Sequence, residues 1–546
     1  MSQSTKTITT KLLIGAGFIA GACFTAAAAL AQPTVGPQVR ADTGGGTAAA
    51  NETSCASTDL FPNEIVAVWN DWRKSTFSEV INMGVGVSLD GGATWTDFLV
   101  RPPAPNQSTV EGDPMTAYDN RTGTLWVGAI SFASNGGLYV AKKIQGSTNF
   151  EPSVQIGQQS FADKCWMAAG PAPGNPNATM VYIAYNEGLW RSADMGQTWQ
   201  GPVSIGFGIG FLPRIAPNGD LFVSWWDFGN GHWVRKSTDG GLSFQSPVKA
   251  ATRMDVWNTQ DGSRFPGTFR SPSMNTMAID PNDGTMYIVY ADTTDNQSNG
   301  KNVDLYFTKS TDGGNSWSTP VVINQDAATP GDQFFPWLEV DKTGMLHMVY
   351  YDSRNTVQND NVVNGMFDAY YMYSTDHGST WSEAKLTPAP FNSDNDGLNR
   401  SSQFIGDYNG LAVGDNRVYP CYLSNQNGDS DIFVNTITID NNNLVLNDPV
   451  PGLVNQNNSI TAGNATPAAE VTFVYGLTSG STNVNGCPGL TVDIKSPKII
   501  GTDVADNSGS ASVTFFVPSN AAGRTVIFQA GERVNCRKSN AVKFTF

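Results

Sequence analysis

Histidine, cysteine and positive charge are scarce in this sequence. The 546 residues include three histidines and six cysteines, and 32 lysines and arginines stand against 48 aspartates and glutamates, a formal net charge of −16. His232, His347 and His377 show no spacing typical of a zinc site. Because the chain is acidic and shows no basic patch, we do not expect it to bind nucleic acid or an anionic membrane surface.

Long apolar runs and helical periodicity are missing after the first residues. The exception is LLIGAGFIAGACFTAAAALA, which follows Lys6 and Lys11 and ends in an Ala-Leu-Ala cleavage site at 29–31. This pattern is typical of a secretory signal peptide over residues 1–31. A lipid anchor at Cys23 is the weaker alternative. No later segment is apolar enough to span a bilayer, so we expect a secreted or cell-surface protein, and a monomer.

Five copies of one eight-residue pattern recur along the chain. The copies are SLDGGATW (88–95), SADMGQTW (192–199), STDGGLSF (237–244), STDGGNSW (310–317) and STDHGSTW (374–381). Each copy predicts a β-hairpin turn, in which the aspartate and the hydroxyls bind backbone groups, glycine supplies a positive φ and the aromatic residue packs beneath. A turn needs its aspartate at this spacing, which assigns a structural role to Asp90, Asp194, Asp239, Asp312 and Asp376.

Short apolar strands alternate with these turns in seven units. The second strand of each unit is the clearest, and its alternation suits half-buried strands: EIVAVWND (64–71), TLWVGAI (124–130), MVYIAYN (180–186), DLFVSWWD (220–227), TMYIVYAD (285–292), MLHMVYYD (345–352) and RVYPCYL (417–423). The predicted fold is therefore all-β, a β-propeller over residues 51–445 with seven blades favoured and six as the alternative. Residues 32–50 look like a flexible linker.

The repeats stop at about residue 445. Residues 446–546 contain short strands separated by Gly, Asn and Ser, which predicts a small C-terminal β-sandwich. Cys487 and Cys536 both lie there and form the favoured disulfide. Cys55 and Cys421 would meet where a propeller closes, leaving Cys165 unpaired, although the sequence leaves this pairing open.

Polar residues recur at the predicted start of the inner strands, which surround one mouth of a propeller channel. Ligand sites commonly lie at such a mouth. The alternative is that these residues cap strands and line a water-filled channel. They are Asn51, Glu52, Glu111, Asp113, Asp163, Lys164, Arg214, Arg270, Gln333, Asp407 and Tyr408.

The five hairpin motifs resemble the Asp-boxes, or BNR repeats, of the sialidase-like β-propeller superfamily, over roughly residues 51 to 440. The resemblance implies a glycoside hydrolase that acts on a glycan. Sialidases of this superfamily bind the substrate carboxylate with arginines, use a tyrosine nucleophile paired with a glutamate, and use an aspartate as acid and base.

Carried onto this sequence, the resemblance makes Tyr408 with Glu111 the nucleophile pair and Asp113 or Asp407 the acid. Arg270 is the substrate-binding residue nearest to the family pattern, in Phe269-Arg270-Ser271-Pro272, and Arg73 and Arg354 are further candidates. The family motif precedes the first box, whereas Arg270 follows three boxes.

The sequence thus predicts an exported propeller that acts on an extracellular glycan by sialidase-type hydrolysis. The alternative is a non-catalytic propeller that binds polysaccharide or protein at the cell surface. No cofactor is required for either. Asp394 and Asp396 in NSDNDG (392–397) resemble the start of a calcium loop; a surface loop rich in Asn and Asp is the favoured alternative.

Overall fold

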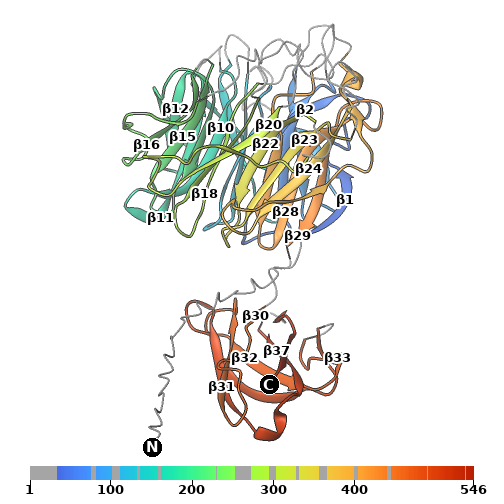
Figure 1. Cartoon of the computed structure of the whole chain (residues 1–546). Coiled ribbons are helices and arrows are strands. Elements are labelled where there is room, and N and C mark those ends of the chain that lie inside the picture. The colour runs from blue at the N-terminus through green and yellow to red at the C-terminus, as the bar shows by residue number, and fades with distance from the viewer. Residues whose placement is uncertain are drawn as a thin grey trace, which may run out of the picture. The chain divides into compact units, whose positions relative to one another are not determined.

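The computed structural model describes residues 33–74, 81–100, 111–131, 136–157, 162–228, 230–252, 272–293, 303–326, 331–355, 366–398, 404–439, 444–487, 490–534 and 537–546. The predicted signal peptide, Arg270 and Cys536 lie outside these residues. The rest divides into two compact units, Gln32–Asn441 and Asn442–Phe546, drawn in Figure 1. The division falls four residues before the predicted boundary because β30, Val445–Leu446, already pairs with β31 of the second unit.

Consecutive strands of the first unit form four-stranded antiparallel sheets, and the sixth sheet carries one extra strand. The first three sheets contain β2 (Ala50–Ala56), β3 (Ile65–Asp71), β4 (Asn82–Ser88) and β5 (Thr96–Leu99); β6 (Met115–Asp119), β7 (Thr124–Ile130), β8 (Leu138–Lys142) and β9 (Val154–Ile156); and β10 (Trp166–Ala172), β11 (Asn175–Tyr185), β12 (Gly188–Ser192) and β13 (Gln200–Val203). The next three contain β14 (Ile209–Ile215), β15 (Leu221–Asp227), β16 (Gly231–Ser237) and β17 (Val248–Ala251); β18 (Thr276–Ile279), β19 (Met286–Asp292), β20 (Asp304–Ser310) and β21 (Val321–Val322); and β22 (Gln333–Val340), β23 (Leu346–Asp352), β24 (Met366–Ser374), β25 (Ser382–Lys385) and β26 (Phe391–Asn392).

A further sheet joins the two ends of the first unit. It contains β27 (Gly410–Gly414), β28 (Arg417–Ser424) and β29 (Asp431–Thr438), and its edge is β1 (Thr34–Arg40). The described part of the unit therefore contains seven sheets. Their first strands, β2, β6, β10, β14, β18, β22 and β27, contact one another in this order, and β27 contacts β2. This closed ring is the β-propeller that the repeated turns predict.

The predicted flexible linker at 32–50 is wrong for residues 34–40, which form a strand. β1 pairs antiparallel with β29, from Thr34 opposite Thr438 to Arg40 opposite Phe433. The Arg40 guanidinium binds the Asp42 carboxylate at 2.9 Å and the buried Asp431 carboxylate at 2.5 Å. Glycine and proline in this stretch suggested flexibility, but an edge strand tolerates both residues because one side of its backbone is left unpaired.

The repeated motifs form the turns between the third and fourth strands. In the first one, Ser88 Oγ donates to Asp90 Oδ1 at 2.8 Å, and the Thr94 N–H donates to the same oxygen at 2.9 Å. Trp95 Nε1 closes the turn on the Gly92 carbonyl at 3.2 Å. The first two bonds recur in all four other copies, and the tryptophan bond recurs at Trp199 and Trp381. In one copy the hydrogen bond from Ser243 holds the pKa of Asp239 at about 2.

The second strands are more buried than their sequence pattern suggests. β3, β19 and β23 are buried along their whole length, on both faces. Each sheet packs between two neighbours, so side chains on both of its faces enter a core, and the prediction of half-buried strands was wrong.

The three cysteines of the first unit, Cys55, Cys165 and Cys421, are buried free thiols. Where the ring closes, Cys55 donates to the Tyr419 carbonyl at 3.4 Å and Cys421 Sγ lies 2.8 Å from Thr53 Oγ1. Burial raises the pKa of Cys55 well above its usual value. The predicted bond between Cys487 and Cys536 stays a prediction because Cys536 is outside the described residues.

The second unit is a small β-sandwich. One sheet contains β30, β31 (Gln456–Gly463) and β36 (Ala511–Val517). Residues of both sheets, such as Ile460, Val513, Phe473 and Phe528, share one apolar core. The remaining strands are β32 (Glu470–Gly476), β35 (Lys498–Val504), β37 (Thr525–Glu532), β38 (Arg537–Lys538) and β39 (Val542–Thr545) in the second sheet, and the pair β33 (Ser479–Asn483) and β34 (Thr491–Ile494).

Helices in the described chain are limited to the 3₁₀ turns η1 (Ser393–Asn395) and η2 (Ser519–Ala521). Within these residues no helix has the length and apolar character needed to cross a membrane.

Candidate functional site

The first strands begin around the propeller axis with an unusual backbone. Register shifts beside Glu52, Gly210 and Phe335 mark β-bulges. Left-handed backbone at residues other than glycine is strained and is common where a side chain must point into a site. The φ angles of the five equivalent residues are 51° at Glu52, 49° at Asp113, 51° at Lys164, 70° at Gly210 and 50° at Phe335.

Four charged residues from four different sheets meet at these strand starts. Lys164 Nζ lies 2.6 Å from Asp407 Oδ2, 2.9 Å from Glu52 Oε1 and 3.4 Å from Asp113 Oδ1. All four residues are buried, and Asn70 donates to the second Glu52 oxygen at 2.6 Å. We call Glu52, Asp113, Lys164 and Asp407 the axial cluster. The sequence placed all four at the channel mouth but did not foresee that the lysine would neutralise the acids.

Asp163 lies beside the axial cluster. Burial raises the pKa of Asp163 to about 6 against the attraction of Lys164, and the Asp113 and Asp407 carboxylates add to the rise. An unfolded aspartate loses its proton near pH 4, so between about pH 4 and pH 6 the folded state holds more protons than the unfolded state. The free energy of unfolding therefore falls as the pH rises through this window.

We expect Asp163→Asn to remove this fall. At pH 7.5 the variant should exceed the wild type in free energy of unfolding by about 1–3 kcal/mol, and the gain should shrink toward pH 4. Urea unfolding between pH 4 and pH 8 measures it, with Asp394→Asn as the control because that carboxylate is exposed. A constant difference between variant and wild type at every pH would contradict the assignment.

Tyr408 lies beside the axial cluster, as the sequence predicted. It is buried, and its hydroxyl has no hydrogen-bond partner among the described residues. Burial, then the Glu52 and Asp113 carboxylates, raise the pKa of Tyr408 well above its usual value. The proposed partner Glu111 accepts a hydrogen bond from Ser131 at 3.3 Å. A tyrosine nucleophile needs a base that accepts its proton, and the described residues place none on this hydroxyl.

The two predicted substrate-binding arginines that the structure describes, Arg73 and Arg354, are held by carboxylates away from the axial cluster. Arg73 follows β3, and its guanidinium binds both oxygens of Asp71 and both oxygens of Asp97, at 2.6 to 3.1 Å. Arg270 lies outside the described residues.

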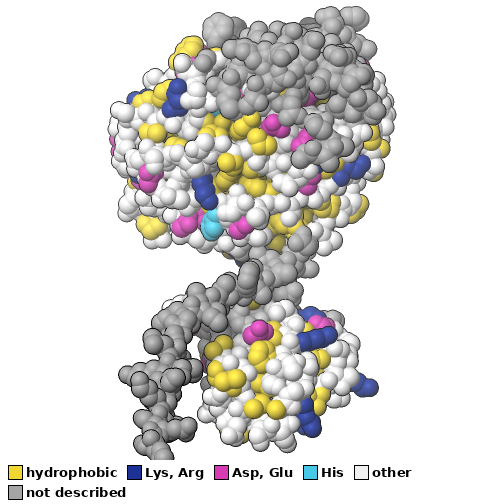
Figure 2. Space-filling view, viewed as in Figure 1, with side chains coloured by type: hydrophobic (Ala, Val, Ile, Leu, Met, Phe, Trp, Pro, Cys, Tyr) yellow, Lys and Arg dark blue, Asp and Glu magenta, His cyan; other side chains and the backbone are white. Residues whose placement is uncertain are grey.

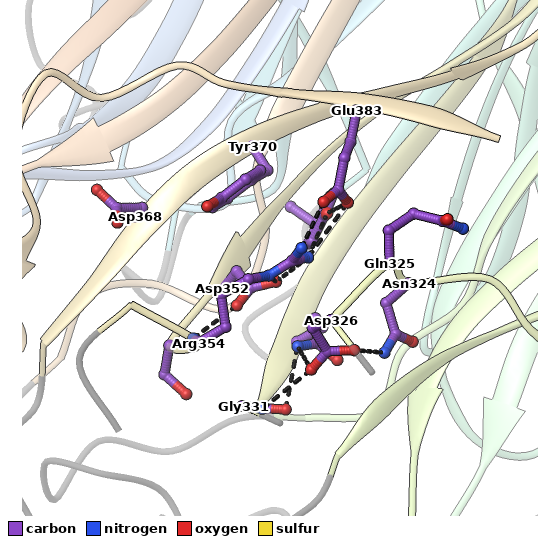
Figure 3. Close-up of polar contacts among 12 residues, drawn as sticks. Asn324, Gln325, Asp326, Gly331, Asp352, Arg354, Asp368, Tyr370 and Glu383 are labelled. Carbon is purple, nitrogen blue, oxygen red and sulfur yellow. Dashed lines mark hydrogen bonds and ion pairs between the residues drawn. The ribbon is translucent and has the colours of Figure 1, made fainter. Parts of the chain in front are cut away.

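Arg354 occupies the position in the sixth sheet that corresponds to Arg73 in the first. Figure 3 shows its guanidinium between the carboxylates of Asp352 and Glu383. Arg354 Nε and Nη2 reach Asp352 Oδ2 at 2.8 and 2.6 Å, and the group lies 4.7 Å from the Tyr370 ring centre. Asp-x-Arg after a second strand thus predicts an ion pair within one sheet.

A cavity of about 410 Å³ lies farther along the axis, toward the box turns, and all seven first strands contribute to its lining. Its size falls in the range of small-ligand sites. Trp166 and Trp337 lie 5.6 Å apart on its wall, and Tyr408 contacts Trp166 at 5.5 Å between ring centres. These aromatic rings separate the cavity from the axial cluster.

An ion pair between the partly exposed Arg214 and the buried Glu339 lies on the cavity wall. Arg214 Nη2 lies 2.6 Å from Glu339 Oε1, which also accepts from Trp337 Nε1 at 3.1 Å, and Tyr118 donates to the other oxygen at 3.3 Å. Burial raises the pKa of Glu339, although Arg214 opposes the rise. Arg214 Nε binds the Met277 carbonyl at 2.7 Å, and Nη1 has no partner among the described residues.

The sequence missed Glu339 and misplaced Arg214. Arg214 lies near the end of β14 and not at its start. Trp337 and Glu339 are two residues apart in β22, so the period of two would have put both on one face of that strand. Gln333 starts β22 but donates to Asp326 at 2.9 Å, away from the axial cluster.

Side-chain oxygens of the predicted calcium loop accept hydrogen bonds from backbone N–H groups. Asp396 accepts the N–H groups of Leu398 at 2.9 Å and Phe404 at 2.8 Å, while Asn392 caps the turn by accepting from the Asp394 N–H at 2.9 Å. Calcium here stays a prediction. At the axis, the Lys164 ammonium takes the place that a metal ion would need between Asp113 and Asp407.

No protein-family model and no curated protein matches the chain. Solved structures with similar folds include the BP39L lectin of Burkholderia pseudomallei, at 13% identity over 71% of this chain and 96% of that one, with a TM-score of 0.44. An intramolecular trans-sialidase from Ruminococcus gnavus is 13% identical over 72% of this chain and 94% of that one, with a TM-score of 0.35. A GH93 α-L-arabinofuranosidase of Fusarium graminearum is 12% identical over 74% of this chain and 98% of that one, with a TM-score of 0.39. Likenesses of this degree carry no argument about the chemistry of this chain.

Proposed function

We propose that this chain is an exported propeller that binds a sugar unit of an extracellular glycan in its axial cavity. The observation that carries the proposal is the cavity wall, where the Trp166 and Trp337 rings lie beside a guanidinium with an unpaired donor, that of Arg214. Trp166 Nε1 is buried without a hydrogen-bond partner, and Arg214 Nη1 has none among the described residues. The Arg214 side chain is 14% exposed and lines the cavity, so a sugar hydroxyl or carboxylate oxygen would supply the acceptor that Nη1 lacks.

The proposal favours binding over sialidase-type hydrolysis. The neutral Tyr408 has no base on its hydroxyl among the described residues, and Arg73 and Arg354 are already held by carboxylates. These groups are therefore poorly prepared for a tyrosine nucleophile and for a substrate carboxylate. The cavity, in contrast, offers aromatic surface with donors and an acceptor, the usual composition of a small-ligand site.

We expect Arg214→Lys to weaken glycan binding at least tenfold, because lysine keeps a charge for Glu339 but loses the unpaired N–H. A glycan array identifies the ligand, and titration calorimetry compares the variants. The control is Arg235→Lys, whose guanidinium binds the Gln245 and Ile205 carbonyls outside the cavity. Equal losses in both variants would contradict a site at Arg214.

Hydrolysis is tested on the same preparations with a fluorogenic sialic-acid glycoside. We expect no turnover by the folded wild type. Turnover that Tyr408→Phe and Arg270→Ala both abolish would replace the binding proposal with the hydrolase.

A further inference from the structure

We propose that Asp280, Asp283 and His377 bind a divalent transition-metal ion of the Zn²⁺ type. One carboxylate oxygen of each aspartate and one ring nitrogen of the histidine all lie within 4.8 Å of one another. The aspartates belong to the turn between β18 and β19, and the histidine belongs to the box turn after β24 of the next sheet. The site would therefore link two adjacent sheets.

The buried member of the trio has a free oxygen that faces the histidine. Asp280 is 1% exposed, and its Oδ1 accepts from the Asn282 backbone and side chain at 2.8 and 3.0 Å. Its Oδ2 is buried, has no hydrogen-bond partner in the described part of the chain and lies 3.7 Å from His377 Nδ1. A buried carboxylate oxygen without a donor is unfavourable, and a cation at this point would satisfy it.

The box turn fixes the position of His377. Its φ is 54°, and the same place in the other boxes is taken by Gly91, Met195, Gly240 and Gly313, with φ between 63° and 75°. Left-handed backbone is uncommon for a residue with a side chain and often marks a functional position. His377 is 53% exposed, whereas the other two histidines are fully buried. Figure 2 shows a histidine on the surface with acidic side chains beside it.

The His377 nitrogen that faces Asp280 has one hydrogen-bond partner. Tyr287 Oη lies 2.8 Å from His377 Nδ1. The imidazole tautomer decides which of the two atoms donates this hydrogen bond. A metal ion would compete with this one hydrogen bond. The nearby Lys309 ammonium binds the His377 carbonyl at 3.0 Å.

The donor set selects the ion. Two carboxylates and a neutral imidazole carry two negative charges, which match a divalent cation. Four ligands at about 2.0–2.1 Å from zinc lie roughly 3.4 Å apart, so the 3.7 Å between His377 Nδ1 and Asp280 Oδ2 needs little closure. Calcium prefers six to eight oxygens, whereas an imidazole suits zinc and its neighbours. Solvent on the exposed side supplies the remaining ligand.

The test titrates Zn²⁺ into the full chain after treatment with EDTA, followed by calorimetry at pH 7. We expect one ion per chain, and at least tenfold weaker binding in His377→Asn and in Asp283→Asn. The matched control is Met195→Asn, which puts the same residue at the same box position of the third sheet and should bind as the wild type does. Asparagine tolerates the left-handed backbone of both turns.

Cobalt distinguishes this site from the thiols. Bound Co²⁺ should show a visible spectrum without a thiolate charge-transfer band. Saturable zinc binding that both His377→Asn and Asp283→Asn weaken, while Met195→Asn does not, supports the proposal. No saturable binding, equal binding by the variants, or a thiolate band would overturn it. Circular dichroism of each variant shows that a loss of binding is not a loss of fold.

Discussion

Replacing Lys164 by methionine is expected to lower the free energy of unfolding by about 3–5 kcal/mol, the cost of leaving buried charges without their partner. The ammonium is the shared counter-charge of Glu52, Asp113 and Asp407, and all three carboxylates are buried. Methionine fills a similar volume, so the loss reflects charge more than packing. Urea unfolding at pH 7.5 measures the effect.

The pH dependence of this variant separates charge from packing. Protonated carboxyls no longer repel one another, so the deficit of Lys164→Met should shrink as the pH falls toward 4. The control is Lys342→Met, because Lys342 is half exposed and its ion pair with Asp415 is a surface pair, worth about 0–1 kcal/mol. A deficit that stays the same at every pH would show that the cost is one of packing.

Deleting residues 34–40 is expected to destabilise the first unit by about 5 kcal/mol. The deletion removes five paired residues of β1, at roughly 1 kcal/mol of net hydrogen bonding each. It also takes Arg40 from Asp431, whose pKa burial already raises to about 7. Urea unfolding, compared with a chain that begins at Gln32, measures the loss.

Adding the strand back tests whether pairing is the cause. A synthetic peptide of residues 33–42 should raise the melting temperature of the deleted protein, because it can occupy the edge of β29. The control peptide has the same composition in scrambled order. A deleted protein as stable as the parent would mean that β1 does not hold the seventh sheet.

Most of the fold could be predicted from the sequence, because its turns and strands are specified by residues close together in the chain. The box turns and the short apolar strands are specified by neighbours in sequence, through bonds such as those of Asp90 with Ser88 and Thr94. β1 was missed because its partner β29 lies about 400 residues away, and its own residues carry no strong strand signal.

The site was predicted only in part. Repetition placed Asp113, Lys164, Asp407 and Tyr408 at the start of inner strands, and three of these four meet in the axial cluster. The sequence could not show that Lys164 is the shared counter-charge of the three acids, because that depends on which side chains from different sheets face one another. For the same reason the sequence did not reveal the group of Asp280, Asp283 and His377. The histidine is about 95 residues from the two aspartates in sequence, but its ring nitrogen lies within 4.8 Å of their carboxylate oxygens.

The pairing of β1 with β29 also determines when the propeller can close during translation. The ring cannot close until residue 438 has left the ribosome, although residue 34 emerged near the start. Until then β1 and the sides of the first and sixth sheets that face the seventh have no partner, so an unfinished chain exposes unpaired strand edges and apolar surface. If the leader is removed after Ala31, two residues separate the new end from β1, and a bulky N-terminal tag would lie beside the closing strand.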